Sequence, residues 1–109
     1  MNKTESIKSS GQLLILSLLQ TKDMYGYEMI EALRLRSENI FNLKEGTLYP
    51  LLHRLEKENF LKSYTQLTAE NRQRKYYKIT RKGLEELEKE KESWRSYSKA
   101  VSSVINFAK

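Results

Sequence analysis

Apolar residues recur every three or four positions through the first third of the chain. Leu14 and Leu18 belong to one such stripe, which predicts a helix over residues 5–20. After a polar break, a second stripe at the same spacing predicts another helix that ends at about residue 36. Asp23 stands just before it and is a candidate N-cap, because its carboxylate can accept hydrogen bonds from the first free N–H groups.

A third helix is predicted to start between residues 44 and 47 and to end near residue 58. Two caps fit its start: Asn42 with Glu45 has the spacing of a capping box, and Thr47 can also act as an N-cap. Pro50 favours the later start, because proline fits the first turn of a helix and disrupts the turns that follow.

The pattern then changes from helical to extended. Residues 60–67 and 75–80 are rich in β-branched and aromatic side chains, and the polar segment 70–74 predicts a turn between two strands. Thr80 is a candidate N-cap for a last helix that runs almost to the end of the chain. The predicted fold is mainly α with a small β-hairpin, a winged helix-turn-helix followed by a long C-terminal helix.

The positive charge of the chain is concentrated in its middle. The formal net charge is +6, and the segment from Lys44 to Lys82 holds ten Lys or Arg against four Glu, which accounts for all of it. The remaining residues carry ten positive and ten negative charges. A protein that docks on phosphates has this distribution, although solubilising surface charge is the simpler explanation.

The third helix has one apolar and one outward face. Placing residues at 100° steps puts four leucines on one side: Leu48, Leu51, Leu52 and Leu55. The opposite face has no acidic member and consists of Gly46, Tyr49, Pro50, His53, Arg54 and Lys57. We expect Arg54 and Lys57 to reach guanine edges or phosphates in a major groove, and Thr47 to contact a phosphate. An ordinary amphipathic surface helix gives the same pattern.

Two further features bear on DNA binding. His53 is the only histidine, so it cannot build a multi-histidine metal site, and we interpret it as a surface residue near DNA. The predicted turn carries three cations, Arg72, Arg74 and Lys75, which suit a minor groove or its flanking phosphates. A solvated turn is the alternative for this segment.

At these residues the sequence resembles the PadR family of bacterial transcriptional regulators. The resemblance rests on Tyr25-Gly26-Tyr27-Glu28, on Gly46-Thr47-Leu48-Tyr49-Pro50-Leu51-Leu52-His53-Arg54-Leu55-Glu56, and on Arg74-Lys75-Tyr76-Tyr77-Lys78-Ile79-Thr80 with Gly83. It covers nearly the whole chain, including the single C-terminal helix of the family's short branch. It implies a winged-helix domain, a homodimer, and repression of nearby genes that a small molecule relieves.

The sequence departs from the family pattern at two turns. The family often has glycine ahead of the Arg-Lys-Tyr-Tyr segment, where this chain has Asn71-Arg72-Gln73. It also often has glycine at the end of the third helix, where this chain has Asn59. Asparagine tolerates positive φ better than most residues, so we expect both turns to form.

The last helix carries a seam of positions that alternate by three and four from residue 84 onward. Its apolar members are Leu84, Leu87, Trp94, Val101 and Ile105, and Lys91 and Ser98 interrupt it. A small domain cannot cover so long a helix. We therefore expect residues 81–109 to be a dimerisation helix appended to a DNA-binding domain over residues 1–80.

A dimer of this kind predicts a palindromic operator, because the third helices of its two copies, the recognition helices, are related by two-fold symmetry. Trp94 is the only tryptophan, and its two copies can approach across the symmetry axis. If the polar breaks in the seam keep it open, a small planar effector, aromatic or hydrophobic, can bind beside Trp94. Plain packing of Trp94 in the interface is the alternative.

Other classes of protein fit less well. With one histidine, no cysteine and only four glycines, the chain lacks the parts of a hydrolase, a thiol enzyme or a phosphate loop, so we expect no enzyme, cofactor or metal site. No apolar run is long enough to span a membrane, and a cytoplasmic protein is expected. A protein-interaction module is disfavoured by the basic outward face, and RNA binding remains open.

Overall fold

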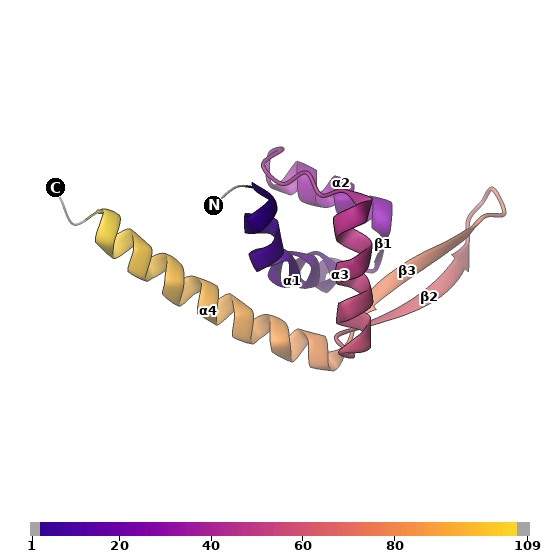
Figure 1. Cartoon of the computed structure of the whole chain (residues 1–109). Helices are drawn as coiled ribbons and strands as arrows, with labels where there is room; N and C mark the ends of the chain where they lie inside the picture. Colours follow the sequence, from indigo (N-terminus) through magenta and orange to yellow (C-terminus); the bar gives the residue numbers. More distant parts are fainter. Residues whose placement is uncertain (1–2, 107–109) are drawn as a thin grey trace.

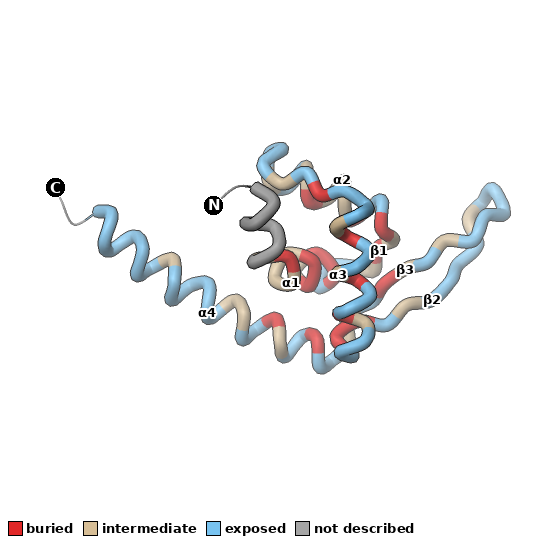
Figure 2. The backbone as a smooth tube through the Cα atoms, in the orientation of Figure 1, coloured by how far each residue is buried: buried red, intermediate tan, exposed pale blue. Residues whose placement is uncertain are grey.

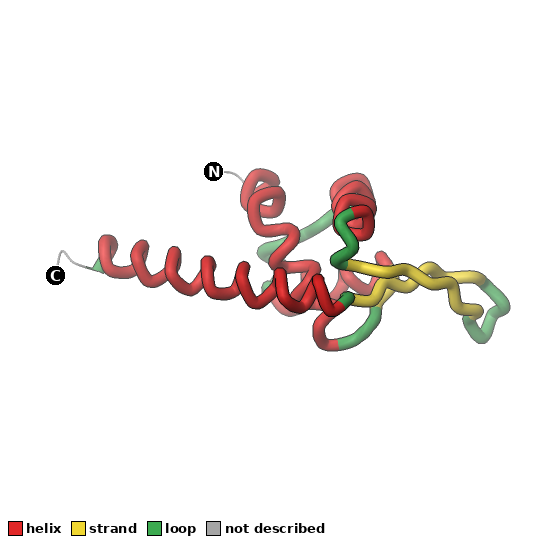
Figure 3. Tube along the Cα trace, turned by 90° about the horizontal axis from the view of Figure 1, so that it is seen from below, coloured by secondary structure: helices red, strands yellow, loops and turns green. Residues whose placement is uncertain are grey.

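The computed structural model describes residues 3–106 and the side chains of residues 10–106. Its elements, in chain order, are α1 (Lys3–Thr21), β1 (Met24–Tyr25), α2 (Gly26–Arg36), α3 (Glu45–Lys57), β2 (Leu61–Leu67), β3 (Gln73–Ile79) and α4 (Arg81–Ile105). Helices α1–α3 form the body, the β2–β3 hairpin projects from one side, and α4 extends from the other (Figures 1 and 3). This arrangement confirms the predicted winged helix-turn-helix with a long last helix.

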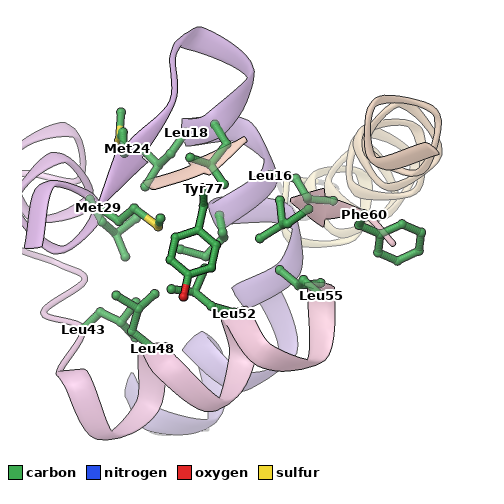
Figure 4. Close-up of a cluster of buried hydrophobic side chains, with 14 of the residues drawn as sticks. Leu16, Leu18, Met24, Met29, Leu43, Leu48, Leu52, Leu55, Phe60 and Tyr77 are labelled. Atoms are coloured by element: carbon green, nitrogen blue, oxygen red, sulfur yellow. The ribbon is translucent and has the colours of Figure 1, made fainter. Parts of the chain in front are cut away.

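The core lies between α1, α2, α3 and the base of the sheet. Leu48, Leu52 and Leu55 of α3 are fully buried, and Tyr77 of β3 is buried among them (Figure 4). Buried residues are concentrated in this body, whereas the outer part of α4 and the tip of the hairpin are mostly exposed (Figure 2). The inner face predicted for α3 is thus confirmed, with Leu51 partly buried and packed against the same core.

The sheet has three strands rather than two. β1 pairs antiparallel with β3, and the order across the sheet is β1-β3-β2. The predicted cap at Asp23 is wrong, because Tyr25 precedes the first residue of α2 and its backbone N–H donates to Glu28 Oε1 (3.3 Å). The Asp23 carboxylate instead accepts a hydrogen bond from the hydroxyl of Tyr64 in β2 (2.7 Å).

Helix α3 starts early, with Lys44 as its N-cap residue and no side-chain cap. Neither predicted cap is formed: the Asn42 amide donates to the carbonyl of Asn39, and Thr47 lies inside the helix. Pro50 consequently stands in the second turn, so the inference of a later start from Pro50 is wrong. Because proline has no N–H, the carbonyl of Gly46 lacks its usual helical donor.

Three local predictions are confirmed. Asn59 (φ 67°) and Asn71 (φ 62°) are left-handed, as the two turns require. Asn59 closes α3 in a Schellman motif, in which the N–H of Phe60 donates to the carbonyl of Leu55 (3.0 Å). The hydroxyl of Thr80 accepts from the N–H of Gly83 and caps α4. The hairpin turn is 68–72 rather than 70–74.

The base of α4 belongs to the body of the same chain. Leu87 is fully buried in the core, so its predicted role in a dimer seam is corrected: it is not available to a partner. The side chain of Lys91 is half-buried and donates to Gln20 Oε1 of α1 (2.9 Å). Within this chain the seam is therefore exposed to a partner only beyond Lys91 and at Leu84, which is 39 % exposed.

Candidate nucleic-acid interface

The centre of the exposed side of α3 is formed by four residues, Gly46, Pro50, His53 and Lys57, which we call the outer face. All four are exposed, and they lie opposite the buried leucines because of the helical period. None is acidic. The outer face therefore presents a neutral and cationic surface with a glycine at its N-terminal end, where a polyanion can approach the backbone closely.

Tyr49 lies on the flank of α3 that faces α2. Its hydroxyl packs against Gly26, where any Cβ would overlap it, and 45 % of the side chain remains exposed. Burial raises the pKa of the Tyr49 hydroxyl, with smaller contributions from Glu45 and Tyr77. The close fit of Gly26 and Tyr49 gives a structural reason for a glycine in the Tyr-Gly-Tyr-Glu segment. Thr47, the predicted phosphate contact, is half-buried.

Arg54 lies on the opposite flank of α3 rather than at its centre. Its Nη1 pairs with Glu58 Oε2 (2.8 Å) and donates to Gln12 Oε1 of α1 (3.3 Å). About half of the Arg54 side chain is still exposed (51 %). The sequence-based picture of a free outward guanidinium is therefore incomplete: Arg54 borders the outer face and is held by two partners within the chain.

The β2–β3 hairpin, which we call the wing, carries the three predicted cations Arg72, Arg74 and Lys75. Their side chains do not form one cluster. Arg72 is exposed at the turn, whereas Arg74 is half-buried with its guanidinium 4.4 Å from the centre of the Tyr25 ring. Lys75 is exposed on the other face of β3, because neighbouring side chains of a strand point to opposite faces. Its ammonium lies 5.5 Å from the centre of the Tyr77 ring. Of the three, Arg72 and Lys75 are free to contact phosphates.

A tyrosine cluster supports the wing, and the sequence-based reasoning missed it. Tyr76 of β3 stacks on Tyr64 of β2, with ring centres 5.7 Å apart, and contacts the edge of Tyr25 at 5.5 Å. The hydrogen bond to Asp23 raises the pKa of the Tyr64 hydroxyl. The aromatic content of the two hairpin strands was the available signal, but the third member, Tyr25, comes from a strand of only two residues.

One side of the outer half of α4 is apolar and exposed. Three predicted seam residues lie there, Trp94, Val101 and Ile105, and Leu84 in the first turn of α4 is exposed as well. Tyr97 and Val104, which the seam did not include, are also exposed (64 % and 74 %). Trp94 is 54 % exposed, and its ring centre lies 6.2 Å from that of Tyr97.

A hollow of about 280 Å³ opens beside Trp94, between α4 and α1. It is lined by Ser10, Leu13, Glu90, Ser93, Trp94 and Tyr97. Two aromatic rings and a leucine suit a flat apolar molecule, and Glu90 adds one ionisable group. The hollow lies on the part of α4 that the rest of the chain leaves exposed.

Two kinds of site are not found in the part of the chain that the structure describes. No group of three or more His, Asp or Glu side chains there is arranged to hold a metal ion. None of the described helices is long and apolar enough to cross a membrane.

Comparison with known proteins gives consistent matches. The model of the transcriptional regulator PadR-like family matches residues 15–89. A PadR family transcription regulator from Clostridium difficile is 38 % identical, with 89 % of this chain and 99 % of that chain covered and a TM-score of 0.77. A PadR-like transcriptional regulator from Bacillus cereus is 33 % identical over 94 % and 97 % of the two chains, with a TM-score of 0.83.

A third solved structure, a transcriptional regulator from Clostridium thermocellum, is 35 % identical and has a TM-score of 0.79. It covers 96 % of this chain and 99 % of that chain. An alignment of this length includes α4 as well as the winged-helix part.

Proposed function

Because the chain belongs to the PadR-like family of transcriptional regulators, we propose that it is a sequence-specific repressor that binds duplex DNA as a homodimer in the cytoplasm. The observation that carries the proposal is the outer face of α3, which is exposed, free of acidic residues and accompanied by a projecting wing (Figure 1). In this proposal residues 1–80 bind DNA and residues 81–109 dimerise.

Each α3 lies in a major groove, with Pro50, His53 and Lys57 toward the base edges and the nearby phosphates. Arg72 and Lys75 of the wing contact phosphates beside that groove. Arg54 reaches DNA after it releases Glu58. An exposed pair four residues apart on a helix contributes only about 0.3–0.5 kcal/mol, so a phosphate can replace the Glu58 carboxylate.

Dimerisation uses the uncovered half of α4. The exposed apolar residues there, Trp94, Val101 and Ile105 among them, become buried against the second copy. The two outer faces are then related by a two-fold axis, so the operator is palindromic, with half-sites about one DNA turn apart. Leu84 lies nearer the winged-helix domain and joins the interface at its edge.

A small planar effector binds in the hollow beside Trp94 and lowers the affinity for DNA, which relieves repression. The aromatic lining of the hollow and its place on the proposed dimerisation helix support this step. Because Trp94 is the only tryptophan, its fluorescence reports binding directly. Quenching by members of a panel of neutral and cationic planar compounds is the expected result, and an unchanged signal across the panel contradicts the effector site.

The DNA-binding function is tested by fluorescence anisotropy. Duplexes from the region upstream of the chain's own gene are compared with a scrambled duplex of the same composition at several salt concentrations. We expect tight binding to the native duplex with affinity that falls steeply with salt, because phosphate contacts release counterions. Equal and weak binding to both duplexes contradicts a sequence-specific regulator.

A further inference from the structure

One polar network joins α3, α1 and α4. Gln12 of α1 lies at its centre: its amide oxygen accepts a hydrogen bond from Arg54 Nη1 of α3 (3.3 Å), and its amide nitrogen donates to Glu90 Oε2 of α4 (2.7 Å). A longer contact joins the same nitrogen to Glu86 Oε2 (3.4 Å). A single half-buried side chain therefore connects the helix that bears the outer face with the helix proposed to dimerise.

The chemistry of this position suits glutamine. A carboxamide has an acceptor and two donors, so it can bind a guanidinium and a carboxylate at the same time. A glutamate at position 12 would keep the contact with Arg54 and repel Glu86 and Glu90. Burial raises the pKa of Glu90, which the hydrogen bond from Gln12 opposes, while the charge of Glu86 raises it and that of Arg54 lowers it.

The two ends of the network lie at the two surfaces that the function needs. Glu90 lines the hollow beside Trp94, so a molecule bound there contacts this residue. At the other end, Arg54 borders the outer face of α3 and is otherwise held only by its exposed pair with Glu58. Gln12 is thus the second partner of Arg54 and, among the described side chains, the only one that links it to the hollow by hydrogen bonds.

We propose that Gln12 is a positioning residue that couples the hollow beside Trp94 to the DNA-binding surface. A molecule in the hollow that keeps the Glu90 carboxylate on Gln12 holds Arg54 against α1 and lowers the affinity for DNA, whereas loss of either contact of Gln12 frees Arg54 to bind a phosphate. The effect on DNA binding rests on the proposed function, whereas the coupling between Glu90 and Arg54 is a property of the chain alone. A contiguous set of contacts can carry a coupling of this kind, and the three helices supply one.

The coupling is first tested without DNA, on the full chain. The NMR signal of the Arg54 guanidinium is compared in the wild type, in Glu90→Ala and in Glu85→Ala. Glu85 is an exposed residue of the same helix, so its replacement removes the same charge without touching Gln12. We expect Glu90→Ala to shift the Arg54 signal and Glu85→Ala to leave it in place.

The same comparison in a Gln12→Ala background should show no shift on replacing Glu90. The proposal is overturned if Glu90→Ala leaves the Arg54 signal unchanged, or if it shifts that signal equally in the Gln12→Ala background.

Binding to the operator duplex supplies the second arm. Gln12→Ala and Glu90→Ala should each raise the affinity about threefold, because Arg54 is released, and the double variant should gain no more than either single change. Gains that multiply, or the same gain in Glu85→Ala, overturn the coupling. If the wild type does not prefer its operator, the proposed function fails, and the NMR comparison still decides the role of Gln12.

Discussion

At the scale of single residues, Gly46 differs from Gly26 in what its missing side chain leaves room for. A Cβ at Gly26 would overlap the hydroxyl of Tyr49, whereas a Cβ at Gly46 would meet nothing within 4 Å. Gly46 also has no positive φ. The folded chain therefore gives no reason for glycine at position 46, and we infer that the reason is the close approach of DNA to the first turn of α3.

Gly46→Ala should consequently separate stability from DNA binding. Alanine in a helix is favoured over glycine by up to about 1 kcal/mol, so the free energy of unfolding should rise. The affinity for the operator should fall about tenfold, since a methyl group at the surface holds the DNA backbone away. Thermal unfolding and anisotropy measure the two effects, and an unchanged affinity contradicts this reason for the glycine.

Gly26→Ala is the matched control. There the added methyl group has no space, and overpacking of this kind costs about 1–3 kcal/mol of unfolding free energy. The two variants introduce the same side chain near the starts of neighbouring helices, so opposite signs of the stability change trace the effect to Tyr49 rather than to alanine itself.

Asn59 supports a second prediction at this scale. Its φ of 67° lies in the left-handed region, which costs most residues about 1–2 kcal/mol and costs glycine little. Asn59→Ala should therefore lower the free energy of unfolding by about 1 kcal/mol, while Asn59→Gly should leave it nearly unchanged. Urea denaturation measures both, and equal losses in the two variants contradict the role assigned to backbone conformation.

Several residue-level features were predictable because their causes are local. Asn59 and Thr80 have roles that depend on φ or on a hydrogen bond within three residues, and the sequence contains that information. The predicted cap at Asp23 was wrong for the opposite reason. Its carboxylate accepts a hydrogen bond from the hydroxyl of Tyr64, which is 41 positions away, and no local pattern predicts such a partner.

At the scale of elements, the wing combines an exposed charge, Arg72, with a half-buried one, Arg74. Arg72→Ala should reduce the slope of affinity against salt by about one and leave stability unchanged, because its side chain is exposed at the turn. Arg74→Ala should instead destabilise the chain by about 0.5–1 kcal/mol, because it removes the cation from the Tyr25 ring. Salt titrations of DNA binding and thermal unfolding distinguish the two variants.

Equal salt slopes for the two variants would contradict this division of the wing. Lys78→Ala is a useful third variant, since Lys78 is an exposed cation nearer the base of β3. A loss of slope there as large as that of Arg72→Ala would show that general charge, rather than the tip of the wing, sets the effect.

The order of the elements was predictable from periodicity, but three details depend on tertiary packing. β1 is two residues long and exists only through its pairing with β3, so it has no signal of its own. The early start of α3 tolerates Pro50 because the unpaired carbonyl belongs to the exposed Gly46. A helical wheel also cannot show that one flank of α3 faces Gln12, which is why Arg54 was placed too far outward.

At the scale of the whole molecule, α4 has two parts with different surroundings. Its base is part of the core through Leu87 and is joined to α1 by Lys91, whereas its outer half is apolar and exposed. The seam spacing predicted apolar residues along α4, but it included the buried Leu87 and left out the exposed Tyr97 and Val104. Among the described side chains, the polar contacts of α4 with α1 lie at Glu86, Glu90 and Lys91.

The outer half of α4 gives the last prediction. The double change Val101→Glu and Ile105→Glu should yield a folded monomer, because it places charge on the apolar surface that is proposed to be buried between two copies. These residues are 38 % and 69 % exposed in the single chain, so the helix content of each copy should be preserved. Sedimentation and circular dichroism measure these two properties.

The matched control is Ser102→Glu with Ser103→Glu, which adds the same charge to the same stretch of α4 at exposed polar positions. It should remain dimeric and bind the palindromic operator like the wild type. The apolar variant should lose most of that affinity, since one outer face then binds without the other, while its weak binding to a single half-site should persist. If the apolar variant sediments as a dimer, the interface lies elsewhere and the spacing of the two outer faces is not set by α4.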